Sequence, residues 1–250
     1  MTTTRRHCLD RKAVYGRGGF TLVEMLVVIA IIALLAVLAL PSVKGVLGSM
    51  DMRGGANIVM SQLELARQTA TTRNVQVEVR FYQDATITDP HPNAANSVGG
   101  TGAFRIIAIA IPSSNPGVIS DEYISSGIQL PGDTVCDATP AYSTLLDPTQ
   151  NDASGNSRQV SATATTQDPS PPTQLKSLPY MKLTYLPNGT MNLSPTGGAS
   201  TTAPGVSGNW CLSMRSLHAA PVTVPHPAPA SNYVTMVLDP TTSRARIYQP

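Results

Sequence analysis

The sequence has 250 residues, of which 13% are charged and 5% aromatic, and its formal net charge is +2. This length fits one domain with extensions, and the few aromatic side chains limit the size of its core. Glycine (19 residues) and proline (21 residues) fall below the share that indicates disorder throughout a chain. The composition therefore excludes a wholly disordered protein.

The first predicted element is an apolar segment over residues 20–40, in which Glu24 is the only charged residue. As a helix it is long enough to cross the ~30 Å hydrocarbon layer of a membrane. Basic residues precede the segment and are almost absent just after it, which places the N-terminus in the cytoplasm. A secretory signal has a shorter apolar region that ends at a small-residue cleavage site. We therefore expect a single transmembrane helix.

A glycine pair and a carboxylate mark the start of this segment, in the order Gly18-Gly19-Phe20 and then Glu24. These residues resemble the type IV pilin superfamily, in which a prepilin peptidase cuts after the last glycine and methylates the new terminus. The resemblance implies a leader over residues 1–19, cleavage between Gly19 and Phe20, and N-methylation of Phe20. It also makes Glu24 the fifth residue of the mature chain and Pro41 its residue 22, both typical of the family.

Removal of the leader would take away five basic residues and one acidic residue, which changes the net charge from +2 to −2. The mature chain would then have no overall positive field, so nucleic acid is not an expected partner. Cys8 would leave with the leader. Cys136 and Cys211 would remain, either as one disulfide in an exported domain or as two separate buried thiols.

The carboxylate of Glu24 is costly inside a membrane unless it is paired, so it is a functional candidate. In the pilin family this glutamate is thought to pair with the terminal amine of a neighbouring subunit as a filament assembles. Here that amine would belong to Phe20. The alternative is an acid that snorkels to the nearby interface.

Residues 41–73 are predicted to continue the helix as an amphipathic extension. Pro41 should kink it, and Gly54 and Gly55 add weak points. We expect the helix to end near Arg73 and Asn74. Its apolar face comprises Val43, Val46, Leu47, Met50, Ala56, Val59, Met60, Leu63, Ala66 and Ala70.

From Val75 the pattern changes to strict alternation, which predicts a strand with apolar residues on one face and Gln76, Glu78 and Arg80 on the other. The passage from the helix with Ala66-Arg67 into this strand resembles the H-type minor pseudopilins of type II secretion and the FimT-like minor pilins. Further strands are predicted at residues 104–111, 181–186, 190–193, 210–214, 233–239 and 244–248.

Two tight turns are predicted between these strands. Asn188-Gly189 supplies the positive-φ residues of one, and Asp239 to Thr242 form the other, where Ser243 stands at a place that glycine would make easier. The C-terminal stretch resembles a pilin-like group named Verru-Chthon cassette protein D. Residues 83–102 and 137–177 are predicted to be long loops with little order.

The sequence offers no catalytic constellation, so we expect no enzyme, no cofactor and no metal site. His91, His218 and His226 lack metal-ligand spacing and fit solvated loops. Asp121-Glu122 should cap or solvate a strand edge. Arg244 and Arg246 share one strand face with Tyr248 and are possible nucleic-acid contacts, although a charged edge strand that resists aggregation explains them as well.

Together these features predict an α+β, pilin-like fold: a long N-terminal helix packed on a mainly antiparallel head over residues 74–250. The expected function is that of a minor pilin or pseudopilin of a type II secretion pseudopilus or a type IV pilus. Its partners would be prepilin peptidase, other pilins and the inner membrane, with the head in the periplasm. The alternative is a surface-exposed pilin that acts as a binding module in DNA uptake or adhesion.

Overall fold

The computed structural model describes residues 19–88, 102–113, 121–140, 142–160, 172, 175, 178–193, 210–219 and 232–249. The chain divides into two compact units, Met1–Lys44 and Gly45–Pro250. Helix α1 (Leu22–Arg73) begins in the first unit and ends in the second, which we call the head. The expected kink at Pro41 stays a prediction.

In the first unit the large apolar side chains of α1 between Leu22 and Leu35 are exposed. Over the described part of the chain, no helix meets the combined requirement of length and apolar character for a membrane span.

In the head, α1 packs one face against the sheet. Its buried residues recur at steps of three and four, as the sequence predicts for one helix face. They are Ala56, Val59, Leu63, Ala66 and Ala70, which the sequence predicted, and Met52, which it did not. The prediction is wrong for Leu47 and Met50, which are 55% and 63% exposed. The helix ends at Arg73 because Asn74 adopts a φ of 52° and the N–H of Val75 donates to the carbonyl of Ala70 at 3.2 Å. This Schellman-type end confirms the predicted boundary.

Gly54 and Gly55 do not break α1. A Cβ atom at Gly55 would lie 3.0 Å from Cγ2 of Thr134, and one at Gly54 would lie 3.5 Å from Cγ of Pro131. The glycine pair therefore lets the segment around Pro131 and Thr134 approach the helix backbone. Its role is close packing rather than weakness.

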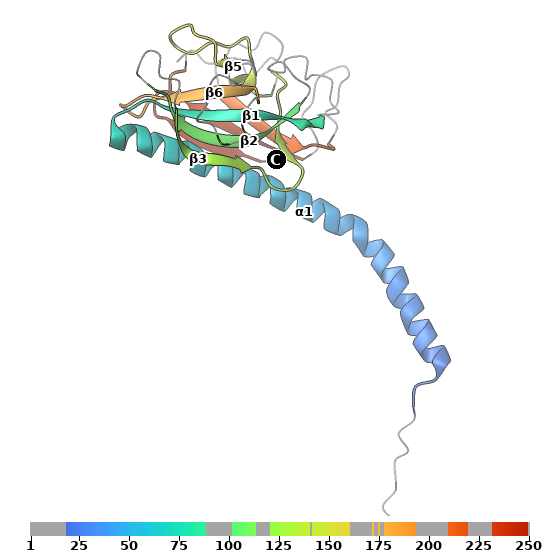
Figure 1. Cartoon of the computed structure of the whole chain (residues 1–250). Helices are drawn as coiled ribbons and strands as arrows, with labels where there is room; N and C mark the ends of the chain where they lie inside the picture. Colours follow the sequence, from blue (N-terminus) through green and yellow to red (C-terminus); the bar gives the residue numbers. More distant parts are fainter. Residues whose placement is uncertain are drawn as a thin grey trace, which may run out of the picture. The chain divides into compact units, whose positions relative to one another are not determined.

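Over the described residues, the head contains one antiparallel sheet of nine strands. Figure 1 shows part of this sheet above α1. The spatial order is β5-β6-β1-β2-β4-β7-β8-β9, and β3 pairs with β2 away from this path. The strands are β1 (Val77–Thr88), β2 (Gly102–Ile111), β3 (Glu122–Gln129), β4 (Thr134–Cys136), β5 (Gln159–Val160), β6 (Tyr180–Tyr185), β7 (Trp210–Ser216), β8 (Tyr233–Asp239) and β9 (Arg244–Tyr248). The arrangement is consistent with the α+β, pilin-like fold predicted from the sequence.

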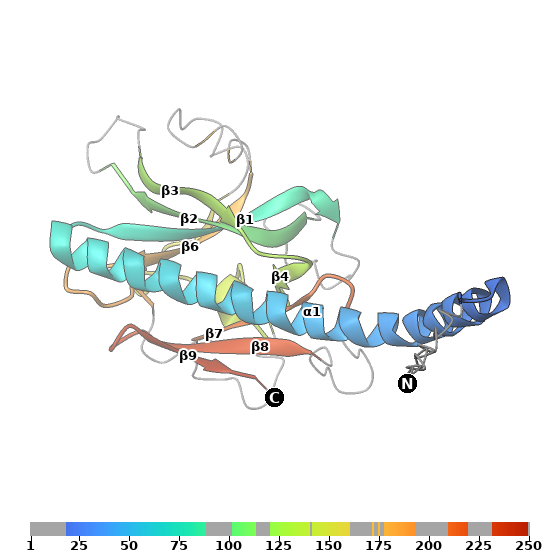
Figure 2. The same cartoon turned by 90° about the horizontal axis from the view of Figure 1, so that it is seen from below.

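Figure 2 looks onto the face of the sheet that α1 covers, with β1 and β2 on one side of the helix and β7 to β9 on the other. The main core lies between α1 and this face. Strand β1 supplies Val77, Val79 and Phe81, each at most 1% exposed, which confirms the predicted apolar face. Trp210, Leu212 and Met214 contribute from β7.

The two predicted hairpin turns are present with different details. Gly189 has a φ of 81°, whereas Asn188 is not in the positive-φ region, so only one of the two expected residues adopts it. Residues 190–193 form no strand, although Met191 forms an isolated bridge with Tyr185 and the N–H of Asn192 donates to the carbonyl of Thr184 at 2.8 Å. Ser243 has a φ of 56° and its hydroxyl donates to the carbonyl of Gly189, which ties the two turns together.

The prediction of two long loops, at residues 83–102 and 137–177, is wrong in part. Strand β1 continues to Thr88, because residues 83, 84 and 88 still pair with β2. In the second predicted loop, residues 137–177, a short 3-10 helix, η2 (Thr144–Leu146), is fully buried, and its two leucines join the core. Strand β5 pairs with β6 further on. Residues 89–101 and 161–171 lie outside the described residues.

Candidate functional site

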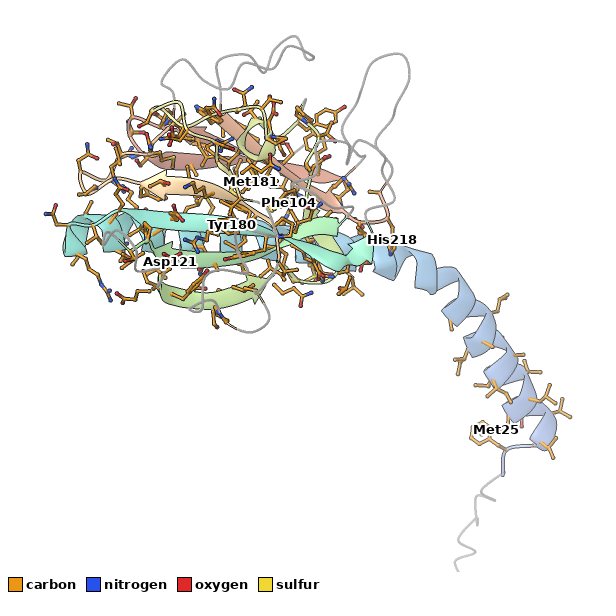
Figure 3. All side chains as sticks on the ribbon, turned by 45° about the horizontal axis from the view of Figure 1, so that its top comes forward. Met25, Phe104, Asp121, Tyr180, Met181 and His218 are labelled. Atoms are coloured by element: carbon orange, nitrogen blue, oxygen red, sulfur yellow. The ribbon has the colours of Figure 1, made fainter. Side chains whose placement is uncertain are left out.

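The bond predicted to be cleaved joins two exposed residues that precede α1. Phe20 is 77% exposed, and a Cβ atom placed on Gly19 would have no neighbour within 4 Å. Both residues are non-helical, and the helix begins at Leu22. The described structure therefore leaves the Gly19–Phe20 bond open to solvent. Figure 3 labels Met25, which lies in the first turn of α1.

A capping box closes the first turn of α1. The backbone N–H and the hydroxyl of Thr21 each donate to Oε2 of Glu24 at 2.8 Å, and the N–H of Glu24 donates to Oγ1 of Thr21 at 3.2 Å. Thr21 thus serves as N-cap and Glu24 as the third helical residue. The pattern Thr-x-x-Glu was present in the sequence and indicates this box, but the sequence prediction did not use it.

The capping box leaves Glu24 able to take another partner. Both hydrogen bonds from Thr21 reach the same carboxylate oxygen, whereas a carboxylate offers about four acceptor positions on its two oxygens. Glu24 therefore combines a local role in helix initiation with an exposed negative charge. This charge also lies where the helix dipole favours it.

Arg244 and Arg246 lie on β9 as the sequence predicts, and both are exposed together with Tyr248. The register places Arg244 opposite Asp239 and Arg246 opposite Val237 on β8. The three side chains share the face of β9 turned away from the core. Their role as nucleic-acid contacts stays a prediction.

The possible disulfide is absent, and Cys136 and Cys211 are both free and buried. Cys136 on β4 is opposite Met214 of β7, so Cys211 lies three residues further along β7. Three residues of strand span about 10 Å, beyond the roughly 7 Å limit for bridged Cα atoms. The odd separation also puts the two thiols on opposite faces of the sheet.

The sequence prediction missed a buried ionic cluster on the face of the sheet opposite α1. Arg80, predicted to lie on the face of the strand opposite its apolar residues, is buried and forms ion pairs with Glu78 at 2.7 Å and with Asp121. Lys182 of β6 pairs with the other oxygen of Glu78 at 3.2 Å. Figure 3 shows Asp121 and Tyr180 beside β1.

Tyrosines complete this cluster. The Arg80 guanidinium lies 4.9 Å from the ring centroid of Tyr180 and 5.4 Å from that of Tyr123, whose hydroxyl accepts a hydrogen bond from it at 2.6 Å. Burial is the largest single influence and opposes the charge of Arg80, but Glu78 and the nearby tyrosine oxygens together outweigh it, so the pKa of Arg80 is raised. Burial also raises the pKa of Tyr82 and Tyr180.

The cluster has a structural role rather than a chemical one. Its cations are paired with carboxylates, and the raised pKa values keep Tyr82 and Tyr180 protonated. Asp121 was expected to cap or solvate a strand edge and instead is half-buried and pairs with Arg80. Glu122 does stay exposed, where it pairs with Arg73 at 2.6 Å.

No group of three or more potential metal ligands occurs among the described residues. His218 is exposed, 3.7 Å from Asp133. His91 and His226 lie outside the described residues.

One comparison with known proteins gives a match. Residues 15–40 match the family model of the prokaryotic N-terminal methylation motif. No curated protein and no solved structure matches the chain. The match covers the leader junction, the capping box and the following apolar helix, and it supports a type IV pilin-like prepilin. The family of this motif is structural rather than enzymatic, and the motif implies processing by prepilin peptidase and assembly with other pilins.

Proposed function

We propose that the protein is a minor pilin or pseudopilin, a structural subunit of a type II secretion pseudopilus or a type IV pilus. Prepilin peptidase cleaves it between Gly19 and Phe20 and methylates Phe20. Residues 20–40 then anchor it in the inner membrane, with the head in the periplasm. It assembles with other pilins through α1 and the charge of Glu24.

One observation carries the proposal: an exposed, non-helical Gly19–Phe20 bond directly precedes a capped helix whose first turn holds an exposed carboxylate. A peptidase needs a bond outside regular structure, and an amine formed at Phe20 needs an anionic partner. The methylation motif supports the same processing. An apolar segment with a single acid fits an anchor whose acid is functional.

The head supports an assignment to the H-type minor pseudopilins and FimT-like minor pilins. The part of this chain that resembles these families is the end of the helix around Ala66-Arg67 and the strand that follows it. Here α1 ends at Arg73 and β1 starts at Val77. The C-terminal hairpin of β8 and β9 is the stretch that resembles Verru-Chthon cassette protein D.

The assembly role of Glu24 is tested by separating its charge from its cap. Glutamine is accepted at the third position of a capping box, so Glu24→Gln keeps the hydrogen bonds to Thr21 and removes the charge. We expect Glu24→Gln to be cleaved normally and to lose at least tenfold in co-purification with partner pilins. Glu24→Asp, which keeps the charge on a shorter stem, should recover part of that loss.

A matched change at the other half of the capping box provides the control. Thr21→Ala weakens the cap by about 1 kcal/mol and keeps the charge, so it should assemble far better than Glu24→Gln. Equal co-purification of Glu24→Gln and the unchanged chain would refute an assembly role for the charge. Failure of Thr21→Ala alone would assign the effect to helix initiation.

A second candidate function is that of a surface-exposed binding module in DNA uptake or adhesion. The observation in its favour is the exposed face of β9 that carries Arg244, Arg246 and Tyr248. Filter binding with the full chain in nanodiscs tests it. Salt-dependent retention of DNA that is lost in Arg244→Ala/Arg246→Ala would support this function, and no retention at low salt would exclude DNA.

A further inference from the structure

A groove of about 300 Å³ lies in the head between α1 and β9. It is lined on the helix side by Met60, Leu63, Glu64 and Arg67, and on the strand side by Ser243, Arg244, Ala245 and Arg246. Successive residues of a strand point to opposite faces of a sheet. A groove lined by the turn residue Ser243 and by three consecutive residues of β9 therefore runs along the edge of this strand rather than over one of its faces.

This edge is open for pairing. β9 is the last strand of the sheet, and among the described residues it pairs with β8 alone. The outer edge of such a strand presents backbone N–H and C=O groups that an extended chain can pair with.

The charges of the groove select an acidic occupant. Three arginines (Arg67, Arg244 and Arg246) line it together with one carboxylate, Glu64, which lies 3.6 Å from Arg67. Nε of Arg67 is buried and has no hydrogen-bond partner in the described structure. Asp239, opposite Arg244, already accepts hydrogen bonds from Thr241 and Thr242. The groove therefore has an excess of positive charge and an unused donor.

The apolar lining favours a peptide over a nucleic acid. Met60, Leu63 and Ala245 offer contacts for aliphatic side chains, and an extended peptide presents alternate residues to two sides. A single nucleic-acid strand needs aromatic rings for stacking, and the groove lining contains none.

We infer that this groove binds an extended acidic segment of a partner protein, which adds a strand to the free edge of β9. The carboxylates of the segment pair with Arg67, Arg244 and Arg246, while its aliphatic residues pack on Met60 and Leu63. The inference goes beyond the proposed function, because binding at this groove requires neither cleavage at Gly19 nor assembly through Glu24.

The test uses the full chain in nanodiscs and a fluorescein-labelled octapeptide of alternating valine and glutamate, followed by fluorescence anisotropy. We expect saturable binding that weakens about fivefold with Arg244→Gln and about fivefold with Arg246→Gln. A probe with lysine in place of glutamate should not bind. A probe with alternate backbone nitrogens methylated should bind at least tenfold more weakly, because it loses strand-pairing donors.

Arg73→Gln is the matched control, since Arg73 is an exposed arginine of the same helix outside the groove lining. Its affinity for the probe should equal that of the unchanged chain. The inference would be overturned if the lysine probe and the methylated probe bound as tightly as the glutamate probe. It would also be overturned by binding of single-stranded DNA without binding of the glutamate probe, or by self-association of the full chain that Arg244→Gln abolishes while the probe stays unbound.

Discussion

The first turn of α1 and the head differ in the exposure and in the partners of their charged groups. Among the described residues, Glu24 is hydrogen-bonded to Thr21, one turn away in the chain, and it is exposed. Arg80 is buried among Glu78, Asp121 and two tyrosine rings that come from several strands. A charge with local, exposed partners remains available to another molecule, whereas a charge paired on all sides in the interior serves the fold. The difference separates the residue proposed for assembly from the residues that hold the head together.

The largest expected effect comes from breaking the buried cluster. Arg80→Met leaves the carboxylates of Glu78 and Asp121 buried without their main cation, which should lower the free energy of unfolding by about 3–5 kcal/mol. Trp210 is the only tryptophan and is buried in the core, so its fluorescence during urea unfolding reports on the head.

The exposed pair of Arg73 and Glu122 provides the contrast. Arg73→Met deletes a pair whose two side chains are 51% and 60% exposed, and it should cost less than about 1 kcal/mol. Equal losses for Arg80→Met and Arg73→Met would contradict the distinction between the buried and the exposed charge.

The next effect concerns the glycine pair of α1. Gly55→Leu forces a side chain against Thr134 and should destabilise the head by about 1–3 kcal/mol in the same urea unfolding. Gly48 has no atom within 4 Å of the Cβ position, so Gly48→Ala should stabilise the helix by about 0.5–1 kcal/mol. A gain in stability for Gly55→Leu would show that the segment around Pro131 is not held close to the helix.

Burial also predicts alkaline sensitivity of the head. It raises the pKa of the Cys136 thiol from 9.0 to about 12, with a further contribution from Asp137. As the pH rises, the thiol therefore loses its proton in the unfolded chain before it does so in the folded one. The free energy of unfolding is unaffected below pH 9 and falls as the pH rises from 9 to about 12. The slope is about 1.4 kcal/mol per pH unit for one proton.

Cys136→Ala tests this assignment by Trp210 fluorescence between pH 8 and pH 12. The variant should be less stable at pH 8, because it leaves a small cavity, but its stability should fall less steeply with pH. Parallel curves for the two proteins would assign the alkaline loss to other groups, such as the buried Tyr82.

The smallest effect is expected for Glu24. The charge of Glu24 is exposed, and glutamine keeps the capping hydrogen bonds to Thr21. Glu24→Gln should therefore leave the urea unfolding of the head, followed by Trp210 fluorescence, unchanged. A shift of the urea midpoint beyond experimental error would contradict the separation between the first turn of α1 and the head.

Much of the fold could be predicted because its signals are local. The apolar face of α1, its end at Asn74 and the bounds of β8 and β9 follow from periodicity and from turn residues. The capping box could also have been found, since Thr21 and Glu24 have the spacing that defines it.

The features that were missed depend on distant parts of the chain. Strand β3 alternates poorly, because it pairs beside β2 away from the main order of strands and none of its residues is fully buried. Arg80 has the sequence pattern of a solvent-facing residue, and its face is covered by residues distant in the chain, such as Asp121, 41 residues later, and Tyr180. The two leucines of η2 stand in a polar stretch whose burial is set by β7. The groove between α1 and β9 likewise joins residues that are far apart in the sequence.

The central claim is that the chain is a prepilin cut between Gly19 and Phe20. Intact-mass and N-terminal peptide mass spectrometry of the protein, expressed with and without prepilin peptidase, tests it most directly. With the peptidase, we expect a mature chain that begins at Phe20 and carries one added methyl group of about 14 Da on its terminal nitrogen. A chain that keeps residues 1–19 in the presence of an active peptidase would contradict the account.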